Sequence, residues 1–124
     1  MISIVIPTYN NLSYLKLAIS SIKKNSFHNN EIILHINEGN DGTLTYAREN
    51  NIKFSHSKVN NGICIGCNEA ASLSKHDLIL YAHDDMYFCP DWDKILIEEV
   101  KKLQTKLFYL SSTMINGDSR LNGH

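Results

Sequence analysis

Short apolar runs alternate along this chain with longer segments in which apolar residues recur every three or four positions. The short runs are rich in isoleucine and leucine, and polar or turn-forming residues close them, which is typical of buried strands. We expect five such strands, at residues 2–7, 31–36, 52–56, 77–82 and 108–112. Strands without polar alternation belong to sheets that are covered on both faces, so the pattern predicts a parallel sheet.

The segments between the runs have helical spacing. The predicted helices cover residues 12–25, 43–50 and 63–74, and a last helix begins at Pro90 and extends to about residue 103. Asn10 and Asn11 precede the first helix, where an asparagine side chain is a good N-cap. Pro90 suits the first position of the last helix, and Asp91 and Asp93 fall in its first turn, where carboxylates are favoured.

The order of elements predicts the fold class. Strands that alternate with helices form an α/β fold, and right-handed crossovers then give a mostly parallel, doubly wound sheet with helices on both faces. A length of 124 residues suits a single domain. We place this domain at residues 1–115 and interpret residues 116–124 as a polar tail.

Composition excludes several classes of protein. Hydrophobic residues make up 43% of the chain and charged residues 20%, as in globular domains. The net charge of −1 gives no basic surface for nucleic acid. The apolar runs are too short to span a bilayer, and the first residues lack the basic start of a signal peptide. We therefore expect a cytoplasmic protein, either free or peripheral to a membrane.

Cysteine and histidine give little evidence of a metal centre of their own. The cysteines are Cys64, Cys67 and Cys89, and an odd count argues against a disulfide framework. The Cys64-x-x-Cys67 pair could serve zinc or redox chemistry, but a structural zinc needs four ligands. In a helix of small residues we expect these thiols to be packing residues. Apart from His83, we interpret the histidines as incidental; they are His28, His35, His56, His76 and His124.

The strand predicted at 77–82 ends in His83, Asp84 and Asp85. Carboxylates at the end of a buried strand are unfavourable unless a cation meets them. Ligands of open α/β sheets bind at the carboxyl ends of the strands, so the aspartate pair suggests a divalent metal that serves a phosphate. The alternative is a solvated pair that caps the next turn.

Four polar loops are predicted at this same edge of the sheet, at residues 8–11, 37–42, 58–62 and 83–86. Glu38 and Asp41 add two carboxylates, although strand-to-helix loops are commonly rich in such residues. The chain contains no G-x-G-x-x-G, no G-x-x-x-x-G-K-[ST] and no G-x-S-x-G motif. These absences argue against a standard dinucleotide fold, a P-loop protein and a nucleophile-elbow hydrolase.

Five motifs, in order, resemble those of the family-2 glycosyltransferases, which have the GT-A fold. They are the opening ISIVIPTYN at residues 2–10, EII at 31–33, NDGT at 40–43, NNG at 60–62 with the later Asn68, and LYAHDD at 80–85 with the following Pro90, Asp91 and Trp92. Each motif is short, but their order along most of the chain makes the resemblance fairly specific.

The resemblance implies transfer of a sugar from a nucleotide-diphosphate donor, which we take to be a UDP-sugar, with Mn²⁺ or Mg²⁺. Charge builds on the leaving diphosphate, and a metal neutralises it as a Lewis acid. In this family pattern Asp85 is the metal ligand, and Asp84 lies near the ribose or the sugar. His83 stands where the family has an aspartate, and imidazole is a second candidate ligand of Mn²⁺.

The same resemblance implies the contacts to the nucleoside. The residue that reads the base falls at Asn37 or at Glu38, depending on where a gap is placed. Asp41 matches more firmly. The other matched positions, along the base, the ribose and the anionic group, are Pro7, Thr8, Tyr9, Asn10, Asn60 and Gly62. Gly62 begins a predicted helix, where backbone N–H groups favour anions.

Two features lie outside this match. The family places its carboxylate general base and its acceptor site in a later half of the domain, so we expect a truncated fold with exposed apolar surface and self-association. The acceptor is not identified. One alternative function is a non-catalytic binding or assembly module. Another is a sugar-phosphate nucleotidyltransferase, which calls for a glycine-rich basic loop where this chain has PTYN.

Overall fold

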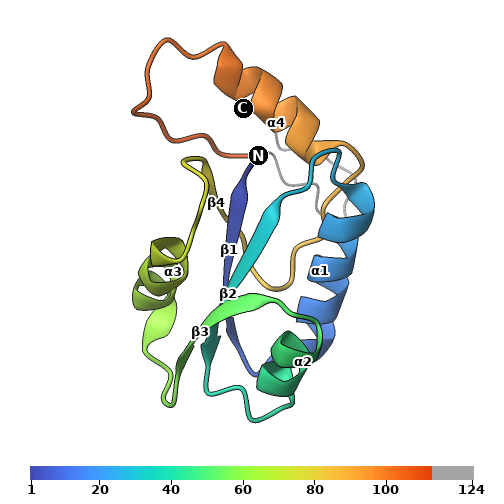
Figure 1. Cartoon of the computed structure of the whole chain (residues 1–124), viewed down its shortest axis with the longest axis vertical. Coiled ribbons are helices and arrows are strands. Elements are labelled where there is room, and N and C mark those ends of the chain that lie inside the picture. The colour runs from blue at the N-terminus through green and yellow to red at the C-terminus, as the bar shows by residue number, and fades with distance from the viewer. Residues whose placement is uncertain (113–124) are drawn as a thin grey trace, which may run out of the picture.

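The computed structural model describes residues 1–112, in which four strands and four helices alternate (Figure 1). The elements are β1 (Ser3–Tyr9), α1 (Leu12–Asn25), β2 (Glu31–Asn37), α2 (Thr43–Glu49), β3 (Lys53–Ser57), α3 (Gly62–Ser72), β4 (Ile79–Tyr81) and α4 (Trp92–Lys101). The last residues of the predicted domain, 113–115, and the predicted tail, 116–124, lie outside the described residues.

The sheet is parallel throughout, with the strand order β3-β2-β1-β4. The chain moves outward from β1 to β2 and β3, and then returns to place β4 on the other side of β1. In open α/β sheets, ligands bind at the carboxyl ends of the strands where the order reverses in this way. The fold therefore directs attention to the crevice beyond the ends of β1 and β4.

Helices cover both faces of the sheet, as the sequence predicts (Figure 1). The larger core lies between the sheet and the helices α1, α2 and α4, and includes Ile4 and Ile6 of β1. The alternate residue Val5 points to the opposite face, where it packs with Ile33 of β2 and Ala70 of α3. This alternation along β1 explains why an uninterrupted apolar strand is needed between two layers of helices.

The start of α1 is predicted correctly, but its capping is not. Leu15, Ile19 and Ile22 form the buried stripe that drives the helix against the sheet. Asn11 is the N-cap residue, yet its side chain makes no capping hydrogen bond. Its amide nitrogen instead donates to Asp84, 73 residues further along the chain.

The last helix begins later than predicted. Pro90 lies before α4, which starts at Trp92, and Asp91 is the residue that precedes the helix, with φ +59° and no capping bond. Only Asp93 therefore falls in the first helical turn.

Asp93 is fully buried and joins α4 to the connection between α1 and β2. Its carboxylate accepts hydrogen bonds from the backbone N–H groups of Phe27 and His28 and from the side-chain amide of Asn30, each at 2.8 Å. Burial alone would raise the pKa of Asp93, but these hydrogen bonds outweigh it, so the pKa is lowered. The aspartate is a structural anchor rather than a helix-dipole partner alone.

The predicted strand at 108–112 is wrong. Within the described residues this segment has no strand, and the side chains of Leu107 and Tyr109 are 90% exposed. A β-prone sequence forms a strand only where a hydrogen-bonding neighbour and a packing surface are available. Among residues 1–112 no strand of the sheet pairs with this segment.

No helix within residues 1–112 is both long enough and apolar enough to cross a membrane.

Candidate functional site

A cavity of about 410 Å³ lies at the carboxyl edge of the sheet, beyond the ends of β1 and β4. Its volume falls within the range of small-molecule sites. Four chain segments contribute its lining, which consists of Pro7, Thr8, Tyr9, Asn10, Asn11, Asn37, Asn60, Gly62, Ile63, Tyr81, His83 and Asp84. The fold thus gathers most of the residues that the sequence nominates; those that do not line the cavity are Glu38, Asp41 and Asp85.

Asp84 connects the two strands that flank the crevice. Its Oδ2 accepts a hydrogen bond of 2.8 Å from the Thr8 hydroxyl at the end of β1. Its Oδ1 accepts one of 3.1 Å from the side-chain amide of Asn11. A carboxylate can accept about four hydrogen bonds, so Asp84 is held in place and still has lone pairs for a ligand.

Asp85 and His83 are exposed and differ from Asp84 in having no side-chain hydrogen bond within the described residues. The centroid of the His83 ring lies 5.0 Å from the centroid of the Tyr81 ring, and both residues line the cavity. Residues 1–112 contain no group of three or more histidine, cysteine, aspartate or glutamate side chains placed to hold a metal. Mg²⁺ at phosphate sites takes one or two carboxylates and completes its shell with phosphate oxygens and water. The donor set therefore fits a metal shared with a diphosphate, and does not fit one held by protein side chains alone.

The charge of the cavity supports the same conclusion. Within the described residues, no lysine or arginine lines it, whereas Asp84 does. The N-terminus of α3 contributes only the partial positive charge of its backbone N–H groups. An anionic ligand here would face a carboxylate without a lysine or arginine beside it, and a bound cation would reduce the resulting repulsion.

The two candidate base readers, Asn37 and Glu38, lie in different places. Asn37 is buried at the end of β2 and lines the cavity, and its Oδ1 accepts a 3.0 Å hydrogen bond from the backbone N–H of Asn61. Glu38 has a φ of +58° and lies outside the cavity lining. Its nearest side-chain partner is the Asn10 amide, at 3.5 Å.

Asn10 joins the ends of β1 and β2. Its Oδ1 accepts hydrogen bonds from the backbone N–H groups of Gly39 and Asn40, at 3.1 and 3.0 Å. This side chain therefore fixes the loop that follows β2 while its own residue lines the cavity.

Asp41 holds two helix starts. Its carboxylate accepts hydrogen bonds from the backbone N–H of Leu12, at 2.9 Å, and from the N–H and hydroxyl of Thr43, at 3.2 and 2.6 Å. Burial alone would raise the pKa of Asp41, but these hydrogen bonds outweigh it, so the pKa is lowered. The carboxylate that the sequence assigns to the nucleoside is thus engaged by the chain itself, at the starts of α1 and α2.

Sequence reasoning missed three lining residues, namely Asn11, Ile63 and Tyr81. Tyr81 could have been found, because it lies two residues before His83 and successive residues of a strand alternate between faces. Its pKa is raised, first by burial and then by the nearby Cys67, Cys64 and Asp84. A protonated phenol at the wall offers a hydrogen-bond donor.

At the start of α3, Gly62 is needed because of its backbone conformation, and not because a side chain would clash there. Gly62 has a φ of +85°, a region that residues with side chains rarely adopt, and a Cβ there would meet nothing within 4 Å. The Asn60 side chain accepts a 3.0 Å hydrogen bond from the Gly62 N–H and fixes this turn.

The cysteine prediction is wrong for Cys64, which is exposed, and Cys67 is only half-buried. Burial raises the pKa of the Cys67 thiol, and the neighbouring Cys64 raises it further. A thiol with a raised pKa is a poor nucleophile near neutral pH, so Cys67 supplies no activated thiolate to the site.

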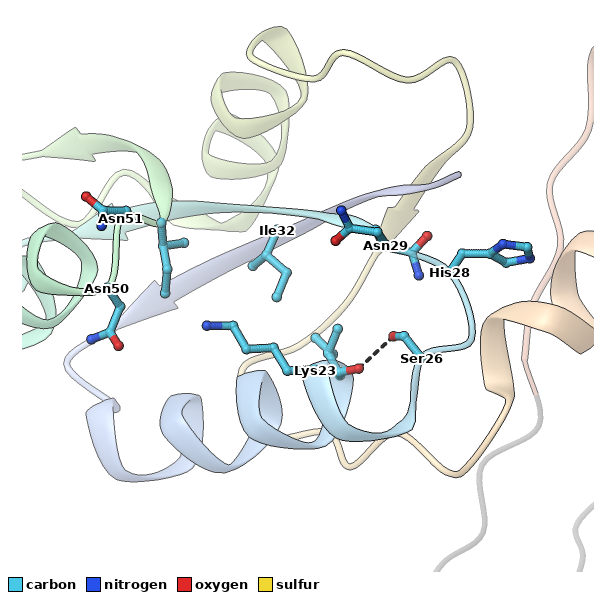
Figure 2. A pocket seen from close by; sticks show the side chains of 10 residues that line it. Lys23, Ser26, His28, Asn29, Ile32, Asn50 and Asn51 are labelled. Carbon is cyan, nitrogen blue, oxygen red and sulfur yellow. Dashed lines mark hydrogen bonds between the residues drawn. The ribbon is translucent and has the colours of Figure 1, made fainter.

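A second cavity, of about 270 Å³, lies at the opposite end of the sheet, between the ends of α1 and α2 (Figure 2). Two of its polar side chains bond to the last turns of these helices. The Ser26 hydroxyl donates to the Ile22 carbonyl at 2.6 Å, the bond dashed in Figure 2. The Asn50 amide donates to the Tyr46 carbonyl at 2.9 Å. None of the predicted site residues lies in it.

Comparison with known proteins agrees with this geometry. A family model described as glycosyl transferase family 2 matches residues 3–124. The chain is similar to an uncharacterised glycosyltransferase of Rickettsia prowazekii, with 33% identity over 110 residues, and to one of Rickettsia typhi, with 31% over 112. Each match covers 86% of this chain but only 34% of the relative, so the chain spans about a third of their length.

Solved structures show the same fold. The chain is similar to S. aureus TarS 1–349 in complex with UDP, with a TM-score of 0.72 and 22% identity over 82% of this chain and 32% of that one. It is also similar to the mannosyltransferase PcManGT from Pyrobaculum calidifontis, in complex with GDP-Man and Mn²⁺. There the TM-score is 0.70, with 18% identity over 84% of this chain and 32% of that one.

Proposed function

The chain belongs to glycosyl transferase family 2, and from that premise we propose that its cavity binds a nucleotide-diphosphate sugar together with Mn²⁺ or Mg²⁺, for transfer of the sugar to a hydroxyl acceptor. The observation that carries the proposal is the charge of the cavity. A site whose lining includes Asp84 and, within the described residues, no lysine or arginine suits a diphosphate better when a divalent cation accompanies it.

In this proposal, different residues contact different parts of the nucleotide-sugar donor. Asp85, with His83 as a second donor, would hold the metal, and the diphosphate would complete the coordination shell. Asp84 would accept hydrogen bonds from the ribose or the sugar. Asn37 would contact the base, and the N-terminus of α3 at Gly62 would meet the anionic end. When bound, the metal neutralises charge on the leaving diphosphate.

The neighbouring structures support the class of ligand. S. aureus TarS was solved with UDP and with UDP-GlcNAc, and PcManGT with GDP-Man and Mn²⁺. We take a UDP-sugar as the first donor to test and a GDP-sugar as the second. A cytoplasmic location stays a prediction.

A nucleotide-binding module without sugar transfer is the second candidate, and one observation favours it. The only carboxylate among the described lining residues is Asp84, which is already bonded to Thr8 and Asn11. No free carboxylate base therefore faces the cavity from residues 1–112. Release of sugar from UDP-GlcNAc or GDP-Man to water or to simple saccharides would count against this candidate.

Calorimetric titration of UDP tests the proposal, first with Mn²⁺, then with EDTA, and then with GDP in place of UDP. The informative variant is Asp85→Ala. Its matched control is Asp77→Ala, which removes an exposed aspartate before β4, outside the cavity lining.

We expect saturable binding that needs the metal in the wild-type protein and in Asp77→Ala, and binding at least tenfold weaker in Asp85→Ala. Full metal-dependent binding by Asp85→Ala would refute the metal assignment. A folded wild-type protein that binds neither nucleotide with Mn²⁺ would refute the proposed function itself.

A further inference from the structure

The histidine at position 35 is not incidental, in contrast to the prediction from the sequence. His35 lies on β2 and is 1% exposed, and both of its ring nitrogens have partners. Nδ1 lies 2.8 Å from the Ser55 hydroxyl, and Nε2 lies 3.2 Å from the Oδ1 of Asn61. A buried imidazole with both nitrogens paired is a specific construction, because burial of an unpaired polar group is costly.

The partners assign the proton on the ring. An amide oxygen only accepts hydrogen bonds, so Nε2 carries the proton and donates to Asn61. Nδ1 pairs with the hydroxyl of Ser55, which can donate or accept. The ring thus bonds to β3 on one side and to the start of α3 on the other.

From Asn61 the connection continues into the cavity. The backbone N–H of Asn61 donates to Oδ1 of Asn37 at 3.0 Å. Asn61 is also the N-cap of α3, and its neighbours Asn60 and Gly62 both line the cavity. One buried ring therefore fixes two parts of the cavity wall, the Asn37 amide and the first turn of α3.

The same connection orients the Asn37 amide. Because its Oδ1 accepts the Asn61 N–H, the orientation of the amide is fixed, and its Nδ2 donor, which has no partner among the described residues, is available to a ligand. A donor at this point suits an acceptor on the ligand, such as a carbonyl oxygen of a nucleobase. If the Asn61 loop moved, the amide would be free to rotate and would present either end.

The His35 ring also packs tightly against the backbone of α3. Gly66 of α3 lies so close that a Cβ on it would be 2.8 Å from Cδ2 of His35. Imidazole and glycine backbone therefore leave no room for the ring to move without moving α3.

We propose that His35 is a positioning residue for the nucleotide site, which acts through Asn61 to set the Asn37 amide and the N-terminus of α3. The inference rests on the proposed function. It is independent of the metal, because neither Asp85 nor His83 belongs to this hydrogen-bonded connection.

Three variants test the role. His35→Phe keeps a ring but removes both hydrogen bonds, His35→Gln retains an N–H donor near the position of Nε2, and Asn61→Ala removes the acceptor without altering the core. The control is Ile22→Val, a core truncation at the far end of α1 that destabilises the fold without touching the connection.

We expect His35→Phe and Asn61→Ala each to weaken Mn²⁺-dependent UDP binding about tenfold, the loss typical of one hydrogen bond. The double variant should bind no more than twofold more weakly than either single variant, because both act through one bond. His35→Gln should stay within about threefold of the wild-type protein, and Ile22→Val within twofold. Binding by folded His35→Phe that matches Ile22→Val would overturn the proposal.

Amide hydrogen exchange in the ligand-free protein separates this proposal from the proposed function. His35→Phe should speed exchange of the Asn61 N–H at least tenfold relative to Ile22→Val. If the wild-type protein binds neither UDP nor GDP, the proposed function fails and the exchange rates alone decide on the connection. Equal Asn61 exchange in both variants would show that His35 does not hold the loop.

Discussion

The close approach of Gly66 to His35 predicts whether the substitution Gly66→Ala stabilises or destabilises the protein. Gly66 lies inside α3, with its backbone against the sheet. A Cβ at this position would lie 2.8 Å from Cδ2 and 3.3 Å from Cγ of His35, and 3.3 Å from Cβ of Pro7. The substitution Gly66→Ala therefore forces either the ring or the whole helix to move.

Two effects of opposite sign compete in Gly66→Ala. Alanine in a helix interior is about 1 kcal/mol more favourable than glycine. Insertion of a methyl group into a tightly packed contact costs about 1–3 kcal/mol. The ring cannot rotate away without breaking its bonds to Ser55 and Asn61, so the cost falls in the upper part of this range. We expect a net loss of about 1 kcal/mol and a fall in Tm of about 4 °C.

The background His35→Ala provides the decisive control. With the ring removed, the closest obstacle to the new Cβ is gone, and the helix propensity of alanine should dominate. Gly66→Ala should then stabilise the protein by up to about 1 kcal/mol. Urea unfolding followed by circular dichroism measures both differences. A Gly66→Ala protein as stable as wild type, or an equal effect of the substitution in both backgrounds, would refute the packing argument.

Three aspartates give the remaining predictions. The pKa of Asp93 is lowered in the folded state, so its contribution to stability is complete above about pH 4 and is lost as pH falls through the folded pKa. In urea unfolding from pH 7 to 2, the difference in the free energy of unfolding between wild type and Asp93→Asn should therefore shrink below pH 4. A difference that stays constant over this range would contradict the prediction. Asp41→Ala removes an acceptor from two helix starts, and should lower the free energy of unfolding by about 1–2 kcal/mol and speed amide exchange at Leu12 and Thr43. Asp84→Asn loses one acceptor oxygen, so calorimetry should show Mn²⁺-dependent UDP binding at least tenfold weaker. The free energy of unfolding should fall by only about 1 kcal/mol. Unchanged affinity for UDP would show that Asp84 does not belong to the site.

The sequence was sufficient to predict the alternation of strands and helices, because short apolar runs alternate regularly with segments of helical spacing. It failed at residues 108–112, where local pattern alone cannot supply a neighbouring strand. The start of α4 was misplaced for a related reason. Pro90 and Asp91 have the right local preferences for a helix start, but the buried Asp93 carboxylate, bonded to the backbone N–H groups of Phe27 and His28, decides where the helix meets the core.

The sequence predicted most of the residues at the candidate site, but not the hydrogen bonds that they make. Asp41, Asp84 and Asp93 look alike in sequence, each in a polar or helix-starting segment. Their roles differ because their partners come from other parts of the chain, up to 76 residues away in the case of Thr8 and Asp84. His35 was missed because one polar residue in an apolar strand carries no signal until Ser55 and Asn61 are placed beside it.

The central position of β1 in the sheet explains why the site assembles where it does. β1 pairs with β2 on one side and β4 on the other, so the residues that follow it can reach both neighbours. Asn10 binds the loop after β2, whereas Thr8 and Asn11 bind Asp84 after β4. A change at the end of β1 should therefore disturb both walls of the cavity, whereas a change in either outer loop should disturb only its own wall.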